Sequence, residues 1–399
     1  MMELLDYRGC EVCLEAPGDR AVKILYLGAL EPGEEKVDHE EDPYTVPAVE
    51  DAEFCGTFRK VLRDPGITKS GLRVRLAAEQ ETAVKVRIAG ELEETLTAGP
   101  GRTAEAVFQV KDLCGKEKEY LAAAHDVLYR LIRETDRVCR KNGIPYFLVF
   151  GGLLGALRYG EMIPWDDDVD VAMTRKDFER FRRIAPKELG KGFRYLDCSD
   201  LGGGAFLDFL GRIVCTEEKL PVSIFSKVSG KCRKEIEDWL PLDIYILDNA
   251  SDSPFLHRIH MFLIRTVYGL GMGHRGYIDM KEYAASGKMT AAAVRVLAFL
   301  GRLLPSSAVF SLHDRVSTLF RGKRTKTFFM SNGFLPFIHT RYEKSWFRTP
   351  GEVDFGGMKL MAPGDVKAYL KRAYYDYYHY PPVEKRVPGH GPSGVKEDK

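Results

Sequence analysis

Residues 163–173 read Ile-Pro-Trp-Asp-Asp-Asp-Val-Asp-Val-Ala-Met. The second half alternates acidic and apolar residues, which predicts a β-strand with one buried face. Side chains two apart on a strand point to the same side, so Asp168 and Asp170 are expected to lie together. Two adjacent carboxylates repel each other unless a hard divalent cation such as Mg²⁺ lies between them. The stretch therefore predicts a metal site, whereas Asp166 and Asp167 fit a solvated acidic turn.

The residues before this stretch indicate a phosphate-binding turn. An apolar run over 146–150 predicts a buried strand, and it leads through Gly151 and Gly152 into a short helix expected over 153–159. Glycine lets a backbone approach a phosphate closely, and a helix amino terminus offers unpaired N–H groups. We therefore interpret both glycines as donor-phosphate contacts. Arg158, about one turn further, is either a phosphate ligand or a surface arginine.

Two later apolar runs each contain one charged residue at an interior position. The run 239–247 contains Asp243, and a lone carboxylate is costly to bury without a cation or a hydrogen-bond donor. Asp243 is therefore the expected third metal ligand and the candidate base. Arg212, in the predicted strand 206–214, is a weaker phosphate candidate, and Asp248 is expected to be a turn residue.

A strand ending in Gly-Gly, a short helix and a strand bearing Asp-x-Asp form the organisation of polymerase-β-like nucleotidyltransferases. The whole run from Gly152 to Met173, including Arg158-Tyr-Gly-Glu-Met-Ile-Pro-Trp-Asp, closely resembles the signature of the LicD family. This family includes bacterial phosphocholine transferases and, more distantly, fukutin-type phosphotransferases. Supporting matches are Asn142-Gly143-Ile-Pro-Tyr-Phe, Leu242-Asp243-Ile-Tyr and Gly357-Met-Lys-Leu-Met-Ala-Pro, so the resemblance covers roughly residues 117–390.

The resemblance implies a nucleotidyltransferase-like fold that moves a phospho-alcohol, most often phosphocholine from CDP-choline. The acceptor is a sugar hydroxyl of a cell-surface glycan, such as a teichoic acid or lipopolysaccharide, or of its lipid-linked precursor. Asp168, Asp170 and Asp243 would hold one or two Mg²⁺ or Mn²⁺ ions. The chain departs from the family pattern at Tyr374-Tyr375-Asp376, where Tyr-Gly-Asp is usual. The tyrosines over 374–380 favour packing over a cage for a quaternary ammonium group.

Two other functions stay open at this point. A true nucleotidyltransferase, which leaves a nucleoside monophosphate on a small molecule or a protein, uses the same metal clamp. An inactive glycan-binding protein would use its amino-terminal part for carbohydrate, although three acids with this spacing argue against it.

The periodicity of the chain predicts two domains and a short tail. Residues 1–113 contain short alternating strands separated by turns, which predicts a small all-β, sandwich-like accessory domain. From Lys116 a helical stripe begins, so residues 116–390 are expected to form a mixed α/β (α+β) catalytic domain. Residues 391–399 are expected to be a disordered tail, and the whole Pro-rich end from 381 is expected to fray. The chemical step should need only the second domain.

Composition and charge indicate the class of protein and the kind of partner it binds. The chain of 399 residues has 45% hydrophobic and 29% charged residues, as in a soluble globular protein. Its net charge of +1 combines about −9 over residues 1–50 (4 Lys and Arg against 13 Asp and Glu) with +10 over the remainder. The basic remainder suits an anionic partner, but no nucleic-acid reader motif is present, so nucleic acid is not expected.

Location follows from the cysteines and the apolar segments. Eight cysteines are too few for a disulfide scaffold, and the start resembles no signal peptide, so a cytoplasmic location is expected. Apolar helices predicted around 255–270 and 291–304 carry flanking arginines. They raise the hypothesis of peripheral contact with the inner membrane surface, against packing over the core.

Overall fold

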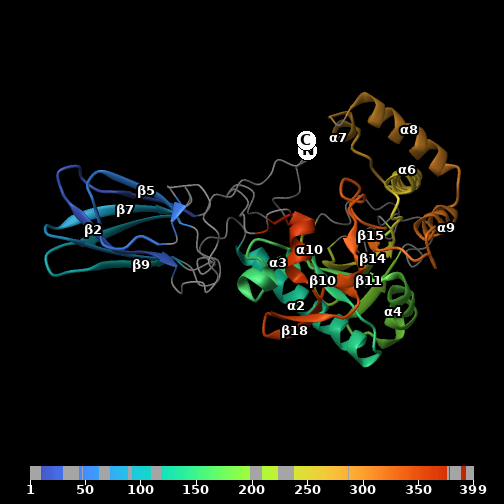
Figure 1. The fold of residues 1–399 in the computed structure, drawn as a ribbon, viewed down its shortest axis with the longest axis horizontal. Helices are drawn as coiled ribbons and strands as arrows, with labels where there is room; N and C mark the ends of the chain where they lie inside the picture. The colour runs from blue at the N-terminus through green and yellow to red at the C-terminus, as the bar shows by residue number, and fades with distance from the viewer. Residues whose placement is uncertain are drawn as a thin grey trace. The chain divides into compact units, whose positions relative to one another are not determined.

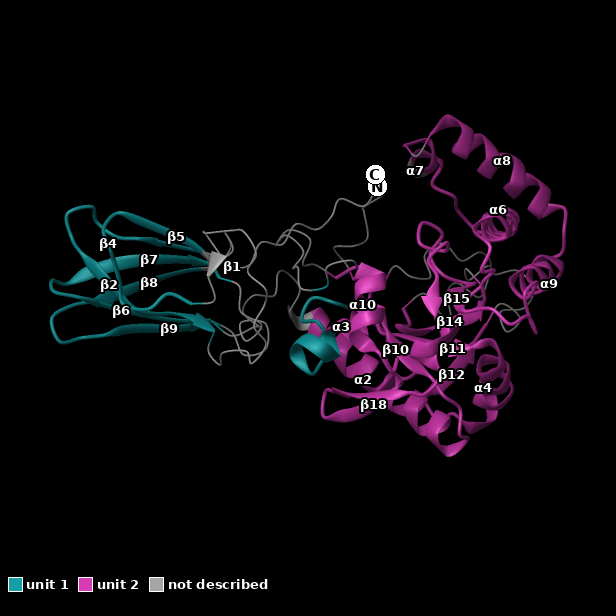
Figure 2. Cartoon of the chain, viewed as in Figure 1, with its two compact units in different colours: residues 1–118, 155–166, 376–387 teal, residues 119–154, 167–375, 388–399 magenta. Residues whose placement is uncertain are grey.

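The computed structural model describes residues 10–29, 45–46, 48–62, 72–88, 92–108, 118–197, 209–222, 238–285, 287–374, 377 and 388–391. The chain divides into two compact units, coloured teal and magenta in Figure 2. Unit 1 comprises Met1–Lys118, Gly155–Asp166 and Asp376–Val387, and unit 2 comprises Glu119–Leu154, Asp167–Tyr375 and Pro388–Lys399. The domain limits expected from the sequence, 1–113, 116–390 and 391–399, stay a prediction.

The amino-terminal strands form two sheets. One has the order β4-β2-β6-β9, and the other has the order β3-β5-β1-β7-β8. All pairs are antiparallel except β3 with β5. The strands are β1 (Cys10–Glu15), β2 (Val22–Ala29), β3 (Thr45–Val46), β4 (Ala52–Phe54), β5 (Thr57–Leu62), β6 (Leu72–Ala78), β7 (Thr82–Ile88), β8 (Leu92–Ala98) and β9 (Ala104–Phe108).

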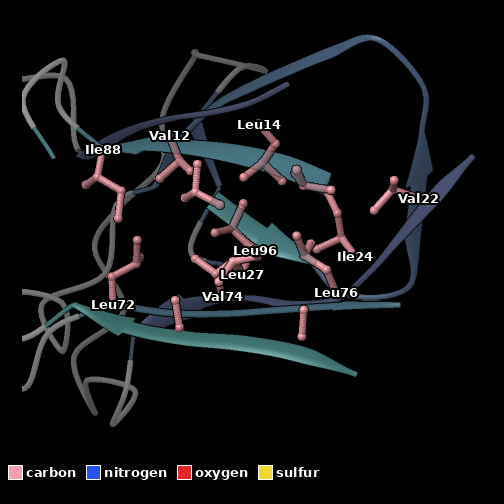
Figure 3. Packing of buried hydrophobic residues seen from close by; sticks show 14 of the residues in the cluster. Val12, Leu14, Val22, Ile24, Leu27, Leu72, Val74, Leu76, Ile88 and Leu96 are labelled. Carbon is pink, nitrogen blue, oxygen red and sulfur yellow. The ribbon is translucent and has the colours of Figure 1, made fainter. Parts of the chain in front are cut away.

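Both sheets contribute to one buried apolar cluster. Alternate side chains along β7 are fully buried, as the two-residue period predicts. Leu14 and Leu96 of one sheet and Ile24 and Leu76 of the other belong to this cluster (Figure 3). The predicted strands are therefore present, while their assignment to a separate sandwich domain stays a prediction.

Unit 2 contains a mixed sheet in the order β10-β11-β14-β13-β12, in which β15 also pairs with β14 and β16 (Figure 1). The strands are β10 (Phe147–Val149), β11 (Asp170–Thr174), β12 (Phe193–Leu196), β13 (Gly211–Cys215), β14 (Pro241–Asn249), β15 (Thr327–Met330) and β16 (Tyr342–Glu343). A separate hairpin joins β17 (Gly351–Phe355) to β18 (Met358–Ala362). The pair β11 and β14 is parallel, and the other pairs are antiparallel. The mixed α/β class is therefore confirmed, and the polymerase-β-like topology stays a prediction.

Helices precede, separate and follow these strands along the chain. They are α2 (Lys118–Lys141), α3 (Phe150–Tyr159), α4 (Arg175–Glu188), α6 (Pro254–Gly271), α7 (Met280–Ala285), α8 (Lys288–Arg302), α9 (Ser306–Ser317) and α10 (Val366–Tyr374). At the start of α4 the Asp177 amide donates to the Thr174 hydroxyl, which confirms the predicted cap. Among the described helices none is long and apolar enough alone to span a membrane, and only α8 and α9 pass as a pair, bent by 119°.

Three local predictions are wrong. The strand expected from Ile163 begins only at Asp170, so Asp168 lies in the connection before it. Helix α3 begins at Phe150, so Gly151 and Gly152 lie inside its first turn instead of before it. Asp248 lies buried within β14, where Arg175 donates to both of its carboxylate oxygens, and a turn is not needed to satisfy it.

Candidate active site

Three charged residues lie in one row across the centre of the unit 2 sheet. Asp170 on β11 is in register with Asp243 on β14, and Asp243 is in register with Arg212 on β13. Residues in register on neighbouring strands place their side chains on the same face. Asp170 and Arg212 are buried. We call Asp170, Asp243 and Arg212 the charged row.

Arg212 and Asp243 form an ion pair within this row. Arg212 Nε donates to Asp243 Oδ1 at 2.7 Å, and its side chain is 5% exposed against 20% for the carboxylate. The pair offsets part of the cost of burying each charge. The sequence singled out both residues as separate candidates, and the structure brings them together.

Tyr245 faces the same charges from the next same-side position of β14. Burial raises the pKa of its hydroxyl well above the usual value, and the charges of Asp170, Asp243 and Asp168 add to this effect, while Arg212 opposes it. Tyr245 therefore stays a neutral phenol beside the charged row. Its ring meets the Phe150 ring edge to face, with 5.1 Å between their centres.

Asp168 lies two residues before Asp170, and the carboxy-terminal segment approaches it. His390 Nε2 lies 3.4 Å from Asp168 Oδ2. Burial opposes protonation of His390, but the hydrogen bond and charge of Asp168, together with Asp167 and Asp243, raise its pKa overall. Sequence reasoning missed His390, because nothing in its spacing links it to an acid more than two hundred residues earlier.

Asp167 is not the solvated turn residue that the sequence suggested. It is 1% exposed, and its carboxylate accepts hydrogen bonds from the Tyr120 hydroxyl at 2.9 Å and from the Gly389 amide at 2.8 Å. The His390 amide donates to both of its oxygens. These donors compensate the burial of the charge. The expectation that the end from 381 frays is wrong for Gly389 and His390, which bind Asp167, while residues 381–387 and 392–399 lie outside the described residues.

The entry into α3 is strained and tightly packed. Phe150 has a φ of 48°, a left-handed conformation that a residue with a large side chain rarely adopts. A Cβ added at Gly152 would lie 2.9 Å from a side-chain carbon of Leu148 and 3.3 Å from one of Val169. Gly152 is therefore required for packing of the helix start, whatever its part in phosphate binding. Its role and that of Gly151 as phosphate contacts stay predictions.

Arg158 lies in the last turn of α3, in unit 1. Its side chain is buried, and Nη2 donates to the carbonyl oxygen of Tyr377 in the same unit. Of the predicted aromatic cluster, Tyr374 and Tyr377 are described and Tyr377 is buried. Tyr375, Tyr378, Tyr380 and Asp376 lie outside the described residues. A phosphate role for Arg158 stays a prediction.

The predicted metal ligands differ in how well they suit a cation. Carboxylate oxygens are the ligands that Mg²⁺ and Mn²⁺ prefer, and Asp168, in the connection before β11, and Asp170, at the start of β11, supply them two positions apart. Asp243 instead directs an oxygen at Arg212. Over the ranges that the structure describes, no three Asp, Glu, His or Cys side chains lie close enough to enclose an ion. Asp168 and Asp170 are the acids that would offer oxygens to a cation, while Asp243 is paired with Arg212. The metal assignment stays a prediction.

Charged side chains gathered on central strands, partly buried and beside a strained backbone, are typical of an enzyme active site. Residues 143–201 match the family model of the LicD/FKTN/FKRP nucleotidyltransferase domain. The match contains Gly151, Gly152, Arg158, Asp168 and Asp170, and it ends before Arg212. The resemblance to the LicD family is therefore confirmed.

Several known proteins are similar to parts of this chain. An uncharacterized protein of Rickettsia typhi is 31% identical over 34% of this chain and 39% of its own length, and one of Rickettsia prowazekii is matched over 23% of its length. The chain thus spans well under half of these two relatives. The lipopolysaccharide cholinephosphotransferase LicD of Haemophilus influenzae is 24% identical over 63% of this chain and 89% of its own length. The human ribitol 5-phosphate transferase FKRP is 40% identical over 15% of this chain and 13% of its own length. The relatives with named activities are transferases.

Proposed function

We propose that the chain is a transferase of the LicD type, which moves a phospho-alcohol from a CDP-alcohol donor to a sugar hydroxyl of a glycan or its lipid-linked precursor. The observation that carries this proposal is the charged row. Its member Asp170 lies two residues after Asp168, and both are within residues 143–201, which match the family model. The names of the similar proteins supply the class of reaction. A cytoplasmic location, expected from the sequence, is part of the same proposal.

Mg²⁺ or Mn²⁺ is the proposed cofactor, held by Asp168 and Asp170. When bound, it would neutralise charge on the donor diphosphate. The chain's own residues would do the remaining work around this position. Arg212, released from Asp243, is suited to donate from its planar guanidinium to phosphate oxygens.

Asp243 is the proposed acceptor for the proton of the attacking hydroxyl, because it lies in register with Asp170 and is the more exposed member of its ion pair. Tyr245, as a neutral phenol held by burial, can donate a hydrogen bond but not take up that proton. The proposed roles therefore differ: the Asp243 carboxylate accepts the proton, and the Tyr245 hydroxyl donates a hydrogen bond.

Phosphocholine is the favoured group, because the cholinephosphotransferase LicD aligns along most of its own length. The ribitol 5-phosphate transferases align only over a short segment. CDP-choline is accordingly the first donor to test, with CDP-ribitol as the comparison.

The test is a thermal-shift and turnover screen of the full chain with Mg²⁺ and each CDP-alcohol. A donor that binds the folded state raises its melting temperature. We expect stabilisation by CDP-choline only with Mg²⁺ or Mn²⁺, and release of CMP when a glycan acceptor is present. Stabilisation or turnover that persists in excess chelator would contradict the metal assignment.

A second candidate is transfer of the nucleoside monophosphate itself, which the description of the matched family model favours. The two reactions break different bonds of the same donor. Mass spectrometry of the acceptor separates them, because one product gains the phospho-alcohol and the other gains the nucleotide.

A further inference from the structure

Helix α6 presents an apolar side that does not pack against the protein. Phe255 and Phe262 are 69% and 68% exposed, and Ile259 between them is also exposed. Positions 255, 259 and 262 share one side of a helix. The opposite side, with Met261, Ile264 and others, belongs to a buried cluster. The exposed side is therefore additional to the side that packs over the core.

The neighbouring helix α8 also has an exposed apolar side. Met289, Val296 and Phe299 are exposed, as is Leu303 immediately after the helix. Positions 289, 296 and 303 repeat every seven residues and so lie on one stripe. A Cβ added at Gly301 would overlap the backbone of Leu270, so α6 and α8 are in close contact. Figure 2 shows both helices in unit 2, drawn in magenta.

Basic residues flank both apolar stripes. On α8, Lys288, Arg295 and Arg302 repeat with the same seven-residue spacing, directly beside the stripe of Met289 and Val296. On α6, Arg258 and Arg265 lie along one edge of its stripe. The two helices together contain no Asp or Glu. This is the composition of a helix that lies in a membrane interface, apolar side inward and basic edge toward anionic headgroups.

A cavity opens beside this basic edge. Its volume is about 370 Å³, and its lining includes three arginines and two aromatic side chains. These residues are Arg275, Arg295, Arg302, Tyr277 and Phe299. Guanidinium groups bind phosphate oxygens well, and aromatic side chains are common at the level of lipid headgroups. The cavity therefore has the chemistry to take a phosphate headgroup.

We propose that the exposed side of α6 and α8, defined by Phe255, Ile259, Phe262, Met289, Val296, Phe299 and Leu303, docks on a bilayer that contains anionic phospholipids. The arginines at the cavity contact lipid phosphates. An acidic protein surface would pair with the basic edge but would leave these seven large apolar side chains without a defined partner. A bilayer satisfies both features, because its headgroups and acyl chains lie at successive depths.

Vesicle sedimentation with the full-length chain tests this proposal. One set of vesicles contains phosphatidylcholine alone, and the other contains phosphatidylglycerol with phosphatidylcholine. We expect binding to the anionic vesicles at low ionic strength, weaker binding to the zwitterionic ones, and loss of affinity as salt rises. The variant F262S/F299S should bind at least about tenfold more weakly, because each phenylalanine leaves the lipid. R295Q should lose about fivefold.

Matched substitutions control for general effects. V296S removes an exposed valine of the proposed surface on α8 and should weaken binding, whereas its control V107S removes an exposed valine from β9 in unit 1. R348Q removes an exposed arginine outside both helices. V107S and R348Q should bind vesicles as the parent does, and circular dichroism should show the same fold for all variants, since the replaced side chains are exposed.

Several results would overturn the proposal. One is no binding to either vesicle at low ionic strength, and another is equal binding by the parent and F262S/F299S. Sedimentation velocity supplies a third: a dimer that F262S/F299S converts to a monomer, with no vesicle binding by either, would show that this side contacts a second copy. None of these results depends on the identity of the donor or acceptor.

Discussion

The sheets of residues 10–108 and the sheet of unit 2 bury different kinds of side chain. Among the described residues, Thr82 is the one buried polar residue before position 118. In unit 2, Asp170, Arg212 and Asp248 are buried on neighbouring strands. Buried charges lower stability unless they are paired, whereas a strand that buries every second, apolar side chain buries no charge. The difference agrees with our proposal that the chemistry lies on the second sheet and not on the first.

The largest expected effect lies in the apolar core of the first region. Leu76→Ala should lower the free energy of unfolding of these sheets by about 2–5 kcal/mol, because a fully buried leucine leaves a cavity. Turnover at saturating donor should not change. Denaturant unfolding and steady-state kinetics measure the two quantities, and exposed Val107→Ala is the control. A loss of turnover in a folded Leu76→Ala protein would show that the first region also supports the chemistry, contrary to the proposed difference between the regions.

Acid should destabilise unit 2 through His313. Burial lowers the pKa of this histidine from 6.5 to about 4, so the unfolded chain binds its proton more readily. This contribution to stability is complete above about pH 6.5 and is lost as the pH falls toward 4. Urea unfolding at several pH values measures it. His313→Gln should flatten this part of the curve, and an unchanged slope would contradict the assignment.

Substitutions of the proposed catalytic carboxylates are expected to have the next largest effect. Asp168→Asn, Asp170→Asn and Asp243→Asn should each lower turnover about a hundredfold, or roughly 2.7 kcal/mol, because each removes charge from the site. Asp168→Asn and Asp170→Asn should keep the fold, since the volume does not change. Asp243→Asn should also lower stability, because it leaves the buried Arg212 without its charged partner, so unfolding is measured beside turnover. Glu105→Gln on β9 serves as the control, because it removes an acid from the first region. Turnover within a few-fold of the parent in all three variants would show that the site is elsewhere.

The smallest effect should come from the contact between Asp167 and the carboxy-terminal segment. Tyr120→Phe removes one hydrogen bond to the Asp167 carboxylate, worth about 1.5–3 kcal/mol of stability because the acceptor is charged, and should lower turnover up to about tenfold. Asp167→Asn should exceed this, because it weakens the bonds from Gly389 and His390 as well. Exposed Asp126→Asn on α2 is the control. Equal kinetics for Asp167→Asn and the parent would mean that residues 389–390 do not support the site.

Sequence pattern predicted what depends on neighbours along the chain. The alternation in β7, the helix after Lys116 and the cap at Thr174 are local features, and all are present. A charged residue within an apolar run is also a local signal, and it identified Arg212 and Asp243 before their pairing was visible. These patterns are informative because burial of apolar side chains and hydrogen bonding of polar groups produce short periodic patterns in the sequence.

Contacts between distant segments were not predictable in the same way. The sequence predicted a turn residue at Asp167 because its hydrogen-bond donors, Tyr120 and Gly389, lie 47 and 222 positions away. Asp248 appeared to end a strand because its partner is Arg175, which lies 73 positions earlier. In both cases a buried acid is stabilised by donors that no local period reveals.

The amides that bind Asp167 come from residues more than two hundred positions later, so this contact can form only late in synthesis of the protein. On the ribosome, Asp170, Arg212 and Asp243 emerge while the last segment has not yet been made. The Arg212–Asp243 pair can then form early, whereas the Asp167 carboxylate must remain hydrated or find other donors until Gly389 and His390 arrive. A product truncated before residue 389 would retain the charged row and yet leave Asp167 without these amides. The order of translation therefore makes this contact among the last parts of the site to be completed.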